Sequence, residues 1–183
     1  MPQQLLTSRL ALRGLRRSDA GPMTLYGSDL RVARMTASIP HPYPPGAAEA
    51  FVESVLNGRS DQDPWVMDAT RSGGAELVGL ITLKRGEGDL SYWVGPPFWN
   101  TGYASEALAE VVRHLFEDMG ISALSASVFT DNPASRHILE KEGFEMTGTQ
   151  ERFSVARAAM VPEWQLSLSA SAWSAMPRRA AFG

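Results

Sequence analysis

The sequence contains no cysteine among its 183 residues. A disulfide framework, a cysteine nucleophile and a cysteine-ligated metal site are therefore excluded, and a reducing cytoplasm is the expected setting. Long apolar runs are missing too, since no stretch of about 18 apolar residues occurs, and the first nine residues lack the basic-then-apolar pattern of a signal peptide. We therefore expect a cytoplasmic protein with no membrane partner.

Neither positive nor negative charge is in large excess. The chain has 17 basic and 20 acidic residues, a formal net charge of -3, so no nucleic-acid partner is expected. The length and a hydrophobic content of 44% suit one sizeable core. No repeat or linker interrupts the chain. We expect a single domain over residues 1–183, with a core at about 5–170 and a C-terminal tail at 171–183.

The first half of the chain reads as strands with two short helices. Ser18 and Asp19 offer an N-cap for a helix reaching about Tyr26, and apolar residues share one face of a helix over 47–56. Glycine-containing turns separate three apolar segments, which predicts an antiparallel meander. Strands are expected at 9–15 and, for the meander, at 64–69, 76–83 and 89–94.

The second half begins with a long helix. An apolar stripe at helical spacing runs over 101–119 and ends at Gly120, and a strand at 121–129 then predicts a parallel right-handed crossover. Asn132 and Pro133 open another helix, which Gly143 ends. Final strands are expected around "ERFSV" and "EWQLSLS", and a frayed tail at 174–183. The fold class is α/β (α+β), with a mixed, mostly antiparallel sheet flanked by helices.

The segment "GPPFWNTGYA" joins the third meander strand to the long helix. Pro96 and Pro97 cannot donate ladder hydrogen bonds, so they turn the chain out of the sheet and separate neighbouring strands. Gly102 lets the backbone approach a ligand, and the N–H groups of the first helical turn suit a pyrophosphate. Taken alone, such a turn is more often an ordinary strand-to-helix loop than a phosphate site. It is neither a Walker loop nor a Gly-x-Gly-x-x-Gly dinucleotide motif.

Five motifs in order give a more specific indication. They are "RLALRGLRRSDA", "IPHPYPPGAAEAFVESV", "LVGLITL", "DLSYWVGPPFWNTGYASEAL" and "DNPASRHILEKEGFEMTG". Together they resemble the GNAT acetyltransferases, specifically the RimJ and RimL type, over roughly residues 5 to 170. The resemblance implies a GNAT fold whose sheet splays after the fourth strand. It also implies acetyl-CoA as the donor and direct transfer to an amine in a ternary complex.

The resemblance implies a set of cofactor contacts, with two departures from the family pattern. Trp99 stands where Gln or Arg is usual, and Asn100 replaces a more typical Gly. Asn132 would bond the pantetheine, and its structural alternative is a helix N-cap. Ser135 would lie near the sulfur, and its structural alternative is a solvated serine in the first turn of the helix. The remaining contacts are backbone groups, at Tyr92, Trp93 and Val94 for the pantetheine and at Asn100, Thr101, Gly102, Tyr103, Ala104 and Ser105 for the pyrophosphate.

The catalytic residues are less clear from the sequence. Many GNAT proteins place a tyrosine acid where this chain has Leu139, so Ser135 is the expected group for the departing thiolate. Glu106 is the first candidate base, although a first-turn carboxylate is also favoured by the helix dipole alone. Asp89, Asp131 and His41 are the further candidates. His114 and His137 are isolated on predicted helices, so no metal is expected.

The weak base signal favours an acceptor with a low pKa. At pH 7 about a tenth of α-amines, but only about 4 in 10,000 lysine amines, are neutral. We therefore expect a protein or peptide N-terminus, or a small amine, as the acceptor. A non-catalytic acyl-CoA-binding module or sensor is the alternative function, and the family's frequent homodimer is the expected assembly.

Overall fold

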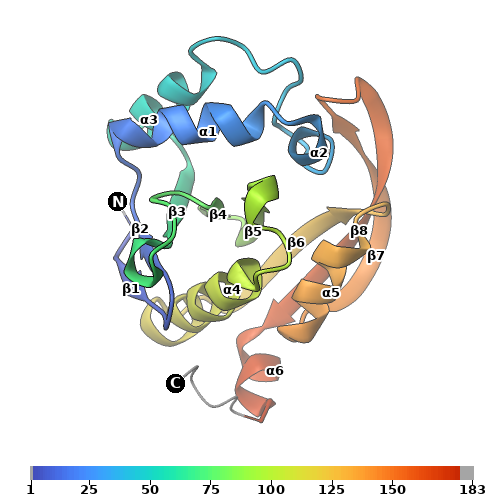
Figure 1. The fold of residues 1–183 in the computed structure, drawn as a ribbon. Helices are drawn as coiled ribbons and strands as arrows, with labels where there is room; N and C mark the ends of the chain where they lie inside the picture. Colours follow the sequence, from blue (N-terminus) through green and yellow to red (C-terminus); the bar gives the residue numbers. More distant parts are fainter. Residues whose placement is uncertain (1, 178–183) are drawn as a thin grey trace.

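The structure, a computed structural model, describes residues 2–177 and shows one eight-stranded sheet with helices on both faces (Figure 1). The order of the strands is β1-β2-β3-β4-β5-β6-β8-β7. All neighbouring strands are antiparallel except β5 and β6. The strands are β1 (Leu5–Leu6), β2 (Ala11–Arg13), β3 (Gln62–Asp68), β4 (Gly79–Lys84), β5 (Asp89–Val94), β6 (Ala123–Phe129), β7 (Glu145–Ser154) and β8 (Ala159–Ser169).

Both the predicted meander and the predicted parallel crossover are confirmed. The meander is β3-β4-β5, and α4 connects β5 to its parallel neighbour β6. The sheet is therefore mixed and mostly antiparallel with flanking helices, as expected. The helices are α1 (Ala20–Gly27), α2 (Leu30–Ala33), α3 (Ala47–Leu56), α4 (Tyr103–Arg113), α5 (Pro133–Lys141) and α6 (Ala170–Ala175).

The larger core lies between the sheet and helices α4 and α5. The apolar stripe of α4 is fully buried there, and Leu139 of α5 joins it. Burying one such Leu or Val side chain contributes about 1.5–3 kcal/mol, so this stripe holds α4 against the sheet. The stripe residues are Ala107, Leu108, Val111, Val112 and, in the following π-helical turn His114–Asp118, Leu115.

A second core lies on the opposite face, where α1 and α3 cover the first half of the sheet (Figure 1). Val52 of α3 and Met23 of α1 pack with Val66 and Leu80 of the sheet. This coverage ends at β5, because the helices of this face do not extend over β6, β8 and β7 in Figure 1. The second half of the sheet therefore presents its polar face to a groove.

The structure differs from the sequence-based expectations at Asp19. Its side chain does not cap α1. Instead it accepts hydrogen bonds at 2.9 Å from both terminal nitrogens of Arg13, while Arg13 Nε bonds Asp68 at 2.8 Å. All three side chains are buried. Leaving a buried guanidinium without anionic partners costs more free energy than leaving a helix start without a cap. Asp19 therefore pairs with Arg13, and the N-cap prediction is wrong.

The predicted frayed tail is wrong in its first residues. Residues 170–175 form α6, which Ser169 caps by accepting a hydrogen bond from the N–H of Ala172. Residues 178–183 lie outside the described part of the chain. None of the helices within residues 2–177 has the length and apolar character needed to span a bilayer.

Candidate functional site

Strands β5 and β6 separate after one short paired segment. Only Asp89 and Leu90 of β5 pair with β6. This is the splay that was expected after the fourth strand, since β5 is the fourth strand when β1 and β2 are counted as one. The prolines after β5 form a 3-10 turn over Pro96–Phe98 that carries the chain away from the sheet. A gap therefore opens beside the second half of β5.

The backbone of Tyr92 and Val94 faces this gap. The N–H of Ser125 donates to the carbonyl of Gly88 at 2.9 Å, which turns the peptide groups of even-numbered residues toward β6. The carbonyl of Trp93 points instead toward Gly79 of β4. Of the three residues expected to bond the pantetheine through the backbone, Trp93 is therefore placed unfavourably, and Tyr92 and Val94 are placed well.

Trp99 occupies the edge of the gap. Its indole Nε1 donates to the carbonyl of Val94 at 2.7 Å, and the guanidinium of Arg31 lies over its ring at 5.5 Å. The carbonyl of Val94 is thus already bonded, which leaves its N–H as the group available to a ligand. Trp99, which stands where Gln or Arg is usual, therefore closes the end of β5. It brings no charge to the loop before α4.

The loop before α4 has the backbone geometry of an anion site. Gly102 has φ +84° and Asn100 has φ +61°, so Asn100 adopts the left-handed conformation for which Gly is more typical. The first hydrogen bond within the helix runs from the N–H of Glu106 to the carbonyl of Gly102, at 3.0 Å. The preceding N–H groups, at Tyr103, Ala104 and Ser105, have no partner one turn earlier and point outward from the helix.

Glu106 lies below this loop and is 4% exposed. Its carboxylate accepts hydrogen bonds from the side chains of Thr7 and Ser8 and from both the N–H and the Nε of Arg9. Burial raises the pKa of Glu106, but the hydrogen bonds from Thr7 and Arg9 outweigh burial and hold it below its ordinary value. A carboxylate so fully bonded is poorly suited to accept a proton from a substrate.

Arg9 is a site residue that the sequence did not indicate. Its Nη1 donates to the carbonyl of Thr101 at 2.8 Å, and its guanidinium lies over the ring of Tyr103 at 4.8 Å. A Cβ at Gly102 would lie only 3.2 Å from Nη2. The cation therefore lies directly beside the candidate anion loop. No spacing rule connects a residue before β2 with a turn more than ninety residues later.

Ser135 and Tyr92 bond each other on the other side of the gap. Ser135 Oγ donates to the Tyr92 hydroxyl at 2.8 Å, and that hydroxyl donates to the Ser135 carbonyl at 3.0 Å. Burial raises the pKa of Tyr92 to about 12. Asn132 caps α5 by accepting from the N–H of Ser135 at 3.2 Å. The family resemblance implies a role for the backbone of Tyr92, but not for its phenol.

The three remaining candidate bases lie in different environments. Asp131 is paired with Arg157 at 2.9 Å and with Arg34 at 3.2 Å, and hydrogen bonding by Arg157 holds its pKa below the ordinary value. His41 is exposed in the loop before α3. Asp89 differs, because burial raises its pKa and the hydrogen bond that it accepts from Ser125 Oγ is long at 3.4 Å. Asp89 is therefore the most basic of these carboxylates.

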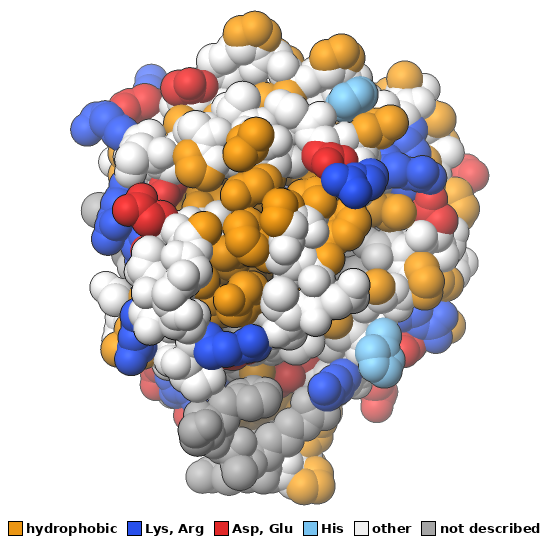
Figure 2. Space-filling model, viewed as in Figure 1, with side chains coloured by type: hydrophobic (Ala, Val, Ile, Leu, Met, Phe, Trp, Pro, Cys, Tyr) orange, Lys and Arg blue, Asp and Glu red, His pale blue; other side chains and the backbone are white. Residues whose placement is uncertain are grey.

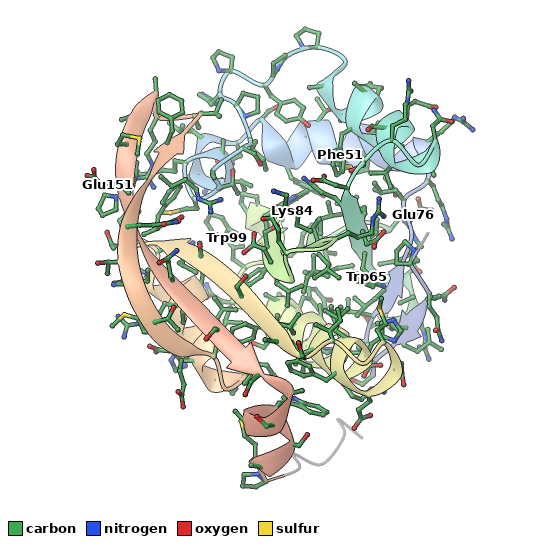
Figure 3. All side chains as sticks on the ribbon, turned by 180° about the vertical axis from the view of Figure 1, so that it is seen from behind. Phe51, Trp65, Glu76, Lys84, Trp99 and Glu151 are labelled. Atoms are coloured by element: carbon green, nitrogen blue, oxygen red, sulfur yellow. The ribbon has the colours of Figure 1, made fainter. Side chains whose placement is uncertain are left out.

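Asp89 lines a groove of about 380 Å³ on the face of the sheet opposite α4 and α5. The groove adjoins the segment where β5 and β6 are paired, so it starts where the gap between the strands closes. Lys84 borders it and lies near the centre of the rear view (Figure 3). Other lining residues are Glu87, Ser125, Ser127, Thr147, Arg152, Gln165 and Ser167.

An apolar hollow lies on the front face. Hydrophobic side chains gather near the centre of the view in Figure 2, and a cavity of about 450 Å³ is lined there by Leu25, Tyr26, Pro96 and Pro97. Asp29 and Arg31 form its charged rim. Within residues 2–177, no three histidine or acidic side chains come together as metal ligands.

Comparisons with known proteins identify the family. Residues 9–145 match the family described as acetyltransferase (GNAT) domain. A Bacillus subtilis protein named uncharacterized N-acetyltransferase YoaA is 36% identical over 83 residues, which span 43% of this chain and about half, 47%, of that relative. Uncharacterized N-acetyltransferase p20 of Bacillus licheniformis is 23% identical over 91% of this chain and 96% of its own length.

The fold has a close structural counterpart. The crystal structure of a GNAT-family acetyltransferase from Bacillus anthracis superposes with a TM-score of 0.78 at 20% identity. The superposition covers 92% of this chain and 99% of the Bacillus anthracis chain. At this identity the likeness concerns the fold alone.

Proposed function

The chain belongs to the GNAT family of acetyltransferases, and we propose that it transfers the acetyl group of acetyl-CoA to a primary amine, directly and in a ternary complex. The observation that carries the proposal is the gap between β5 and β6, which opens beside the outward-facing amides of α4. A covalent relay through cysteine is excluded, because the sequence has none. The RimJ and RimL type remains part of the proposal on the strength of its five motifs.

The residues present fit acetyl-CoA. The N–H groups of Tyr92 and Val94 can bond an extended, amide-bearing arm as they would bond a neighbouring strand. The amides at 103–105, the helix dipole and Arg9 suit a diphosphate. When bound, the cofactor supplies an acetyl group activated as a thioester.

Ser135 is the residue that would face the thioester sulfur of the bound cofactor. Its Oγ can turn from the Tyr92 hydroxyl, so its O–H would be available as a donor to the departing thiolate. Tyr92 keeps α5 in position, because its hydroxyl also bonds the Ser135 carbonyl. Burial raises the pKa of Tyr92 to about 12, and both hydrogen bonds of its hydroxyl are to Ser135, so Tyr92 serves as a positioning residue.

Asp89 is the proposed base, in place of Glu106. It lies in the groove on the face away from α4 and α5, the side from which an acceptor can approach the gap. Its raised pKa makes it a better proton acceptor for an ammonium group than the fully bonded Glu106. Glu106 takes a positioning role, holding Arg9 beside the loop.

The acceptor is a small amine or a peptide N-terminus, since a single carboxylate base suits amines of low pKa. A non-catalytic acyl-CoA-binding protein is the second candidate, favoured by the buried Leu139 at the position of the usual tyrosine acid. Thiol release from acetyl-CoA in the presence of amine panels distinguishes the two. Amine-dependent release supports the enzyme, and CoA binding without release for any amine supports the second candidate.

A further inference from the structure

The groove around Asp89 contains a guanidinium whose ends are free. Arg152 of β7 donates through Nε to Glu163 Oε1 at 3.1 Å, and Gln150 donates to the same oxygen at 2.5 Å. The Glu163 side chain is 3% exposed, whereas that of Arg152 is 42% exposed. The buried carboxylate thus fixes the stem of Arg152, while Nη1 and Nη2, at the groove that Arg152 lines, make no hydrogen bond to any of residues 2–177.

Asp89 provides an opposite charge in the same groove. Its carboxylate receives only the long hydrogen bond from Ser125, and burial raises its pKa while the charge of Arg152 opposes that rise. Asp89 therefore lies within electrostatic reach of Arg152 without bonding it. A guanidinium and a carboxylate that are both largely unbonded face one cavity.

The rest of the groove is mostly polar, with Ala126 and Leu166 as its apolar members, and nearly balanced in charge. Lys84 and Glu87 pair with each other at 2.7 Å, so neither adds an unpaired charge. Hydroxyl and amide groups complete the wall, from Ser125, Ser127, Thr147, Gln165 and Ser167. A volume of about 380 Å³ is that of a small-molecule site. Such a wall matches a small ligand that carries one charge of each sign.

We propose that the acceptor is a free α-amino acid, whose carboxylate pairs with Nη1 and Nη2 of Arg152 and whose amine faces Asp89. This rests on the proposed function, which places the acceptor in this groove. The terminal edge of a guanidinium is the group best shaped for a carboxylate. A polyamine would place a second positive charge against Arg152. A peptide N-terminus would offer Arg152 only a neutral amide, because its first peptide bond stands where a free amino acid has its carboxylate.

The test compares matched acceptors. Each of the twenty L-amino acids and its carboxamide is offered with acetyl-CoA, and thiol release is measured. For the preferred side chain, kcat/KM calculated per neutral amine is about 10- to 100-fold higher for the acid than for the amide, the worth of a charge-assisted pair. Arg152→Met reduces the acid to the level of the amide and leaves the amide unchanged. Arg152→Lys, which keeps the charge without the fork, gives an intermediate value.

Two control variants separate recognition from folding. Arg17→Met removes an exposed arginine that pairs with Glu53 far from the groove and leaves both acceptors unchanged. The double variant Arg152→Met with Glu163→Gln removes the buried charge that Arg152→Met would leave unpaired. It is expected to show the same selective loss of the acid, with a melting temperature nearer to that of the wild type.

Several outcomes overturn the inference while the proposed function stands. These are equal use of acids and amides by the wild type, equal loss of both in Arg152→Met, and turnover of spermidine but of no amino acid. If no amine is acetylated, the proposed function fails, and calorimetric titration of the CoA-loaded protein with the amino acids decides the inference. Heat that Arg152→Met abolishes supports it, and no heat contradicts it.

Discussion

Arg9 Nε lies 2.7 Å from Oε2 of Glu106, and this pair joins the turn before β2 to the first turn of α4. The cation then reaches the Thr101 carbonyl, so one side chain spans the buried carboxylate and the loop that starts the helix. Without Arg9, the negative charge of Glu106 would lie uncompensated under the proposed diphosphate site.

Arg9→Met is therefore expected to weaken acetyl-CoA binding by about five- to thirtyfold, or about 1–2 kcal/mol. The affinity for S-acetylpantetheine, which lacks the diphosphate, should fall only slightly. Adding Glu106→Gln to Arg9→Met removes the uncompensated charge and restores part of the affinity. Titration calorimetry with both ligands measures this. An equal loss for the two ligands would show that Arg9 acts only through general stability.

Ser135→Ala should lower kcat by about a hundredfold, as expected for a lost proton donor, with little change in the KM for acetyl-CoA. Tyr92→Phe should have a smaller effect on kcat, because the serine hydroxyl remains. Steady-state kinetics over a range of acetyl-CoA concentrations separates the two parameters. A change confined to KM in Ser135→Ala would assign the serine to binding alone.

Asp89 should make kcat/KM fall at low pH, which gives the pH profile an acid limb. Below its raised pKa the carboxyl is protonated and cannot accept a proton, so kcat/KM falls with a midpoint above the ordinary value of 3.8. The charges that face Asp89 are Lys84 from β4, Arg152 from β7, Glu163 from β8 and Glu87 from the hairpin. Asp89→Asn should lower activity and abolish this limb. A pH profile of Asp89→Asn that keeps the wild-type limb would assign the base elsewhere.

The same group affects stability with a defined sign. Because the folded state raises the pKa of Asp89, it binds the proton more tightly than the unfolded chain does, and ionisation destabilises the fold. This cost is absent below the ordinary pKa and fully present above the raised one. Asp89→Asn should therefore raise the melting temperature at pH 7 but not at pH 3. Calorimetric scans at both pH values check this, and a lower melting temperature at pH 7 would contradict it.

Arg13 should be a major contributor to stability. Its guanidinium is buried and bonded to both Asp19 and Asp68, so Arg13→Met leaves two buried carboxylates unpaired. The expected loss is about 3–5 kcal/mol in the free energy of unfolding, measured by urea denaturation. The exposed Arg17→Met is the matched control and should leave the midpoint unchanged. A loss in Arg13→Met no larger than in this control would refute the role.

The sequence predicted the elements whose signals are local. Periodicity placed α3 and α4, glycine-containing turns placed the β3-β4-β5 meander, and the pair Asn132 and Pro133 placed the start of α5. The Asn132 cap is confirmed, whereas its contact with the pantetheine stays a prediction. The loop over 100–105 also stays a predicted cofactor site, now with its backbone geometry known.

The remaining features depend on contacts between distant segments. Arg9 meets Glu106 across 97 residues, and Tyr92 meets Ser135 across 43, so neither pair has a spacing that a sequence pattern could show. In the sequence Glu106 is one candidate base, with a first-turn carboxylate favoured by the helix dipole as the alternative. Its four hydrogen bonds come from residues 7–9, which the fold alone brings to α4.

The central claim is that backbone amides at the splayed edge of β5 and at the start of α4 hold the cofactor. Amide hydrogen exchange with and without CoA tests it most directly. CoA should slow exchange at the N–H groups of Tyr92 and Val94 and of residues 103–105, and pantetheine alone should protect only the two in β5. Binding of CoA that leaves exchange at these amides unchanged would contradict the account.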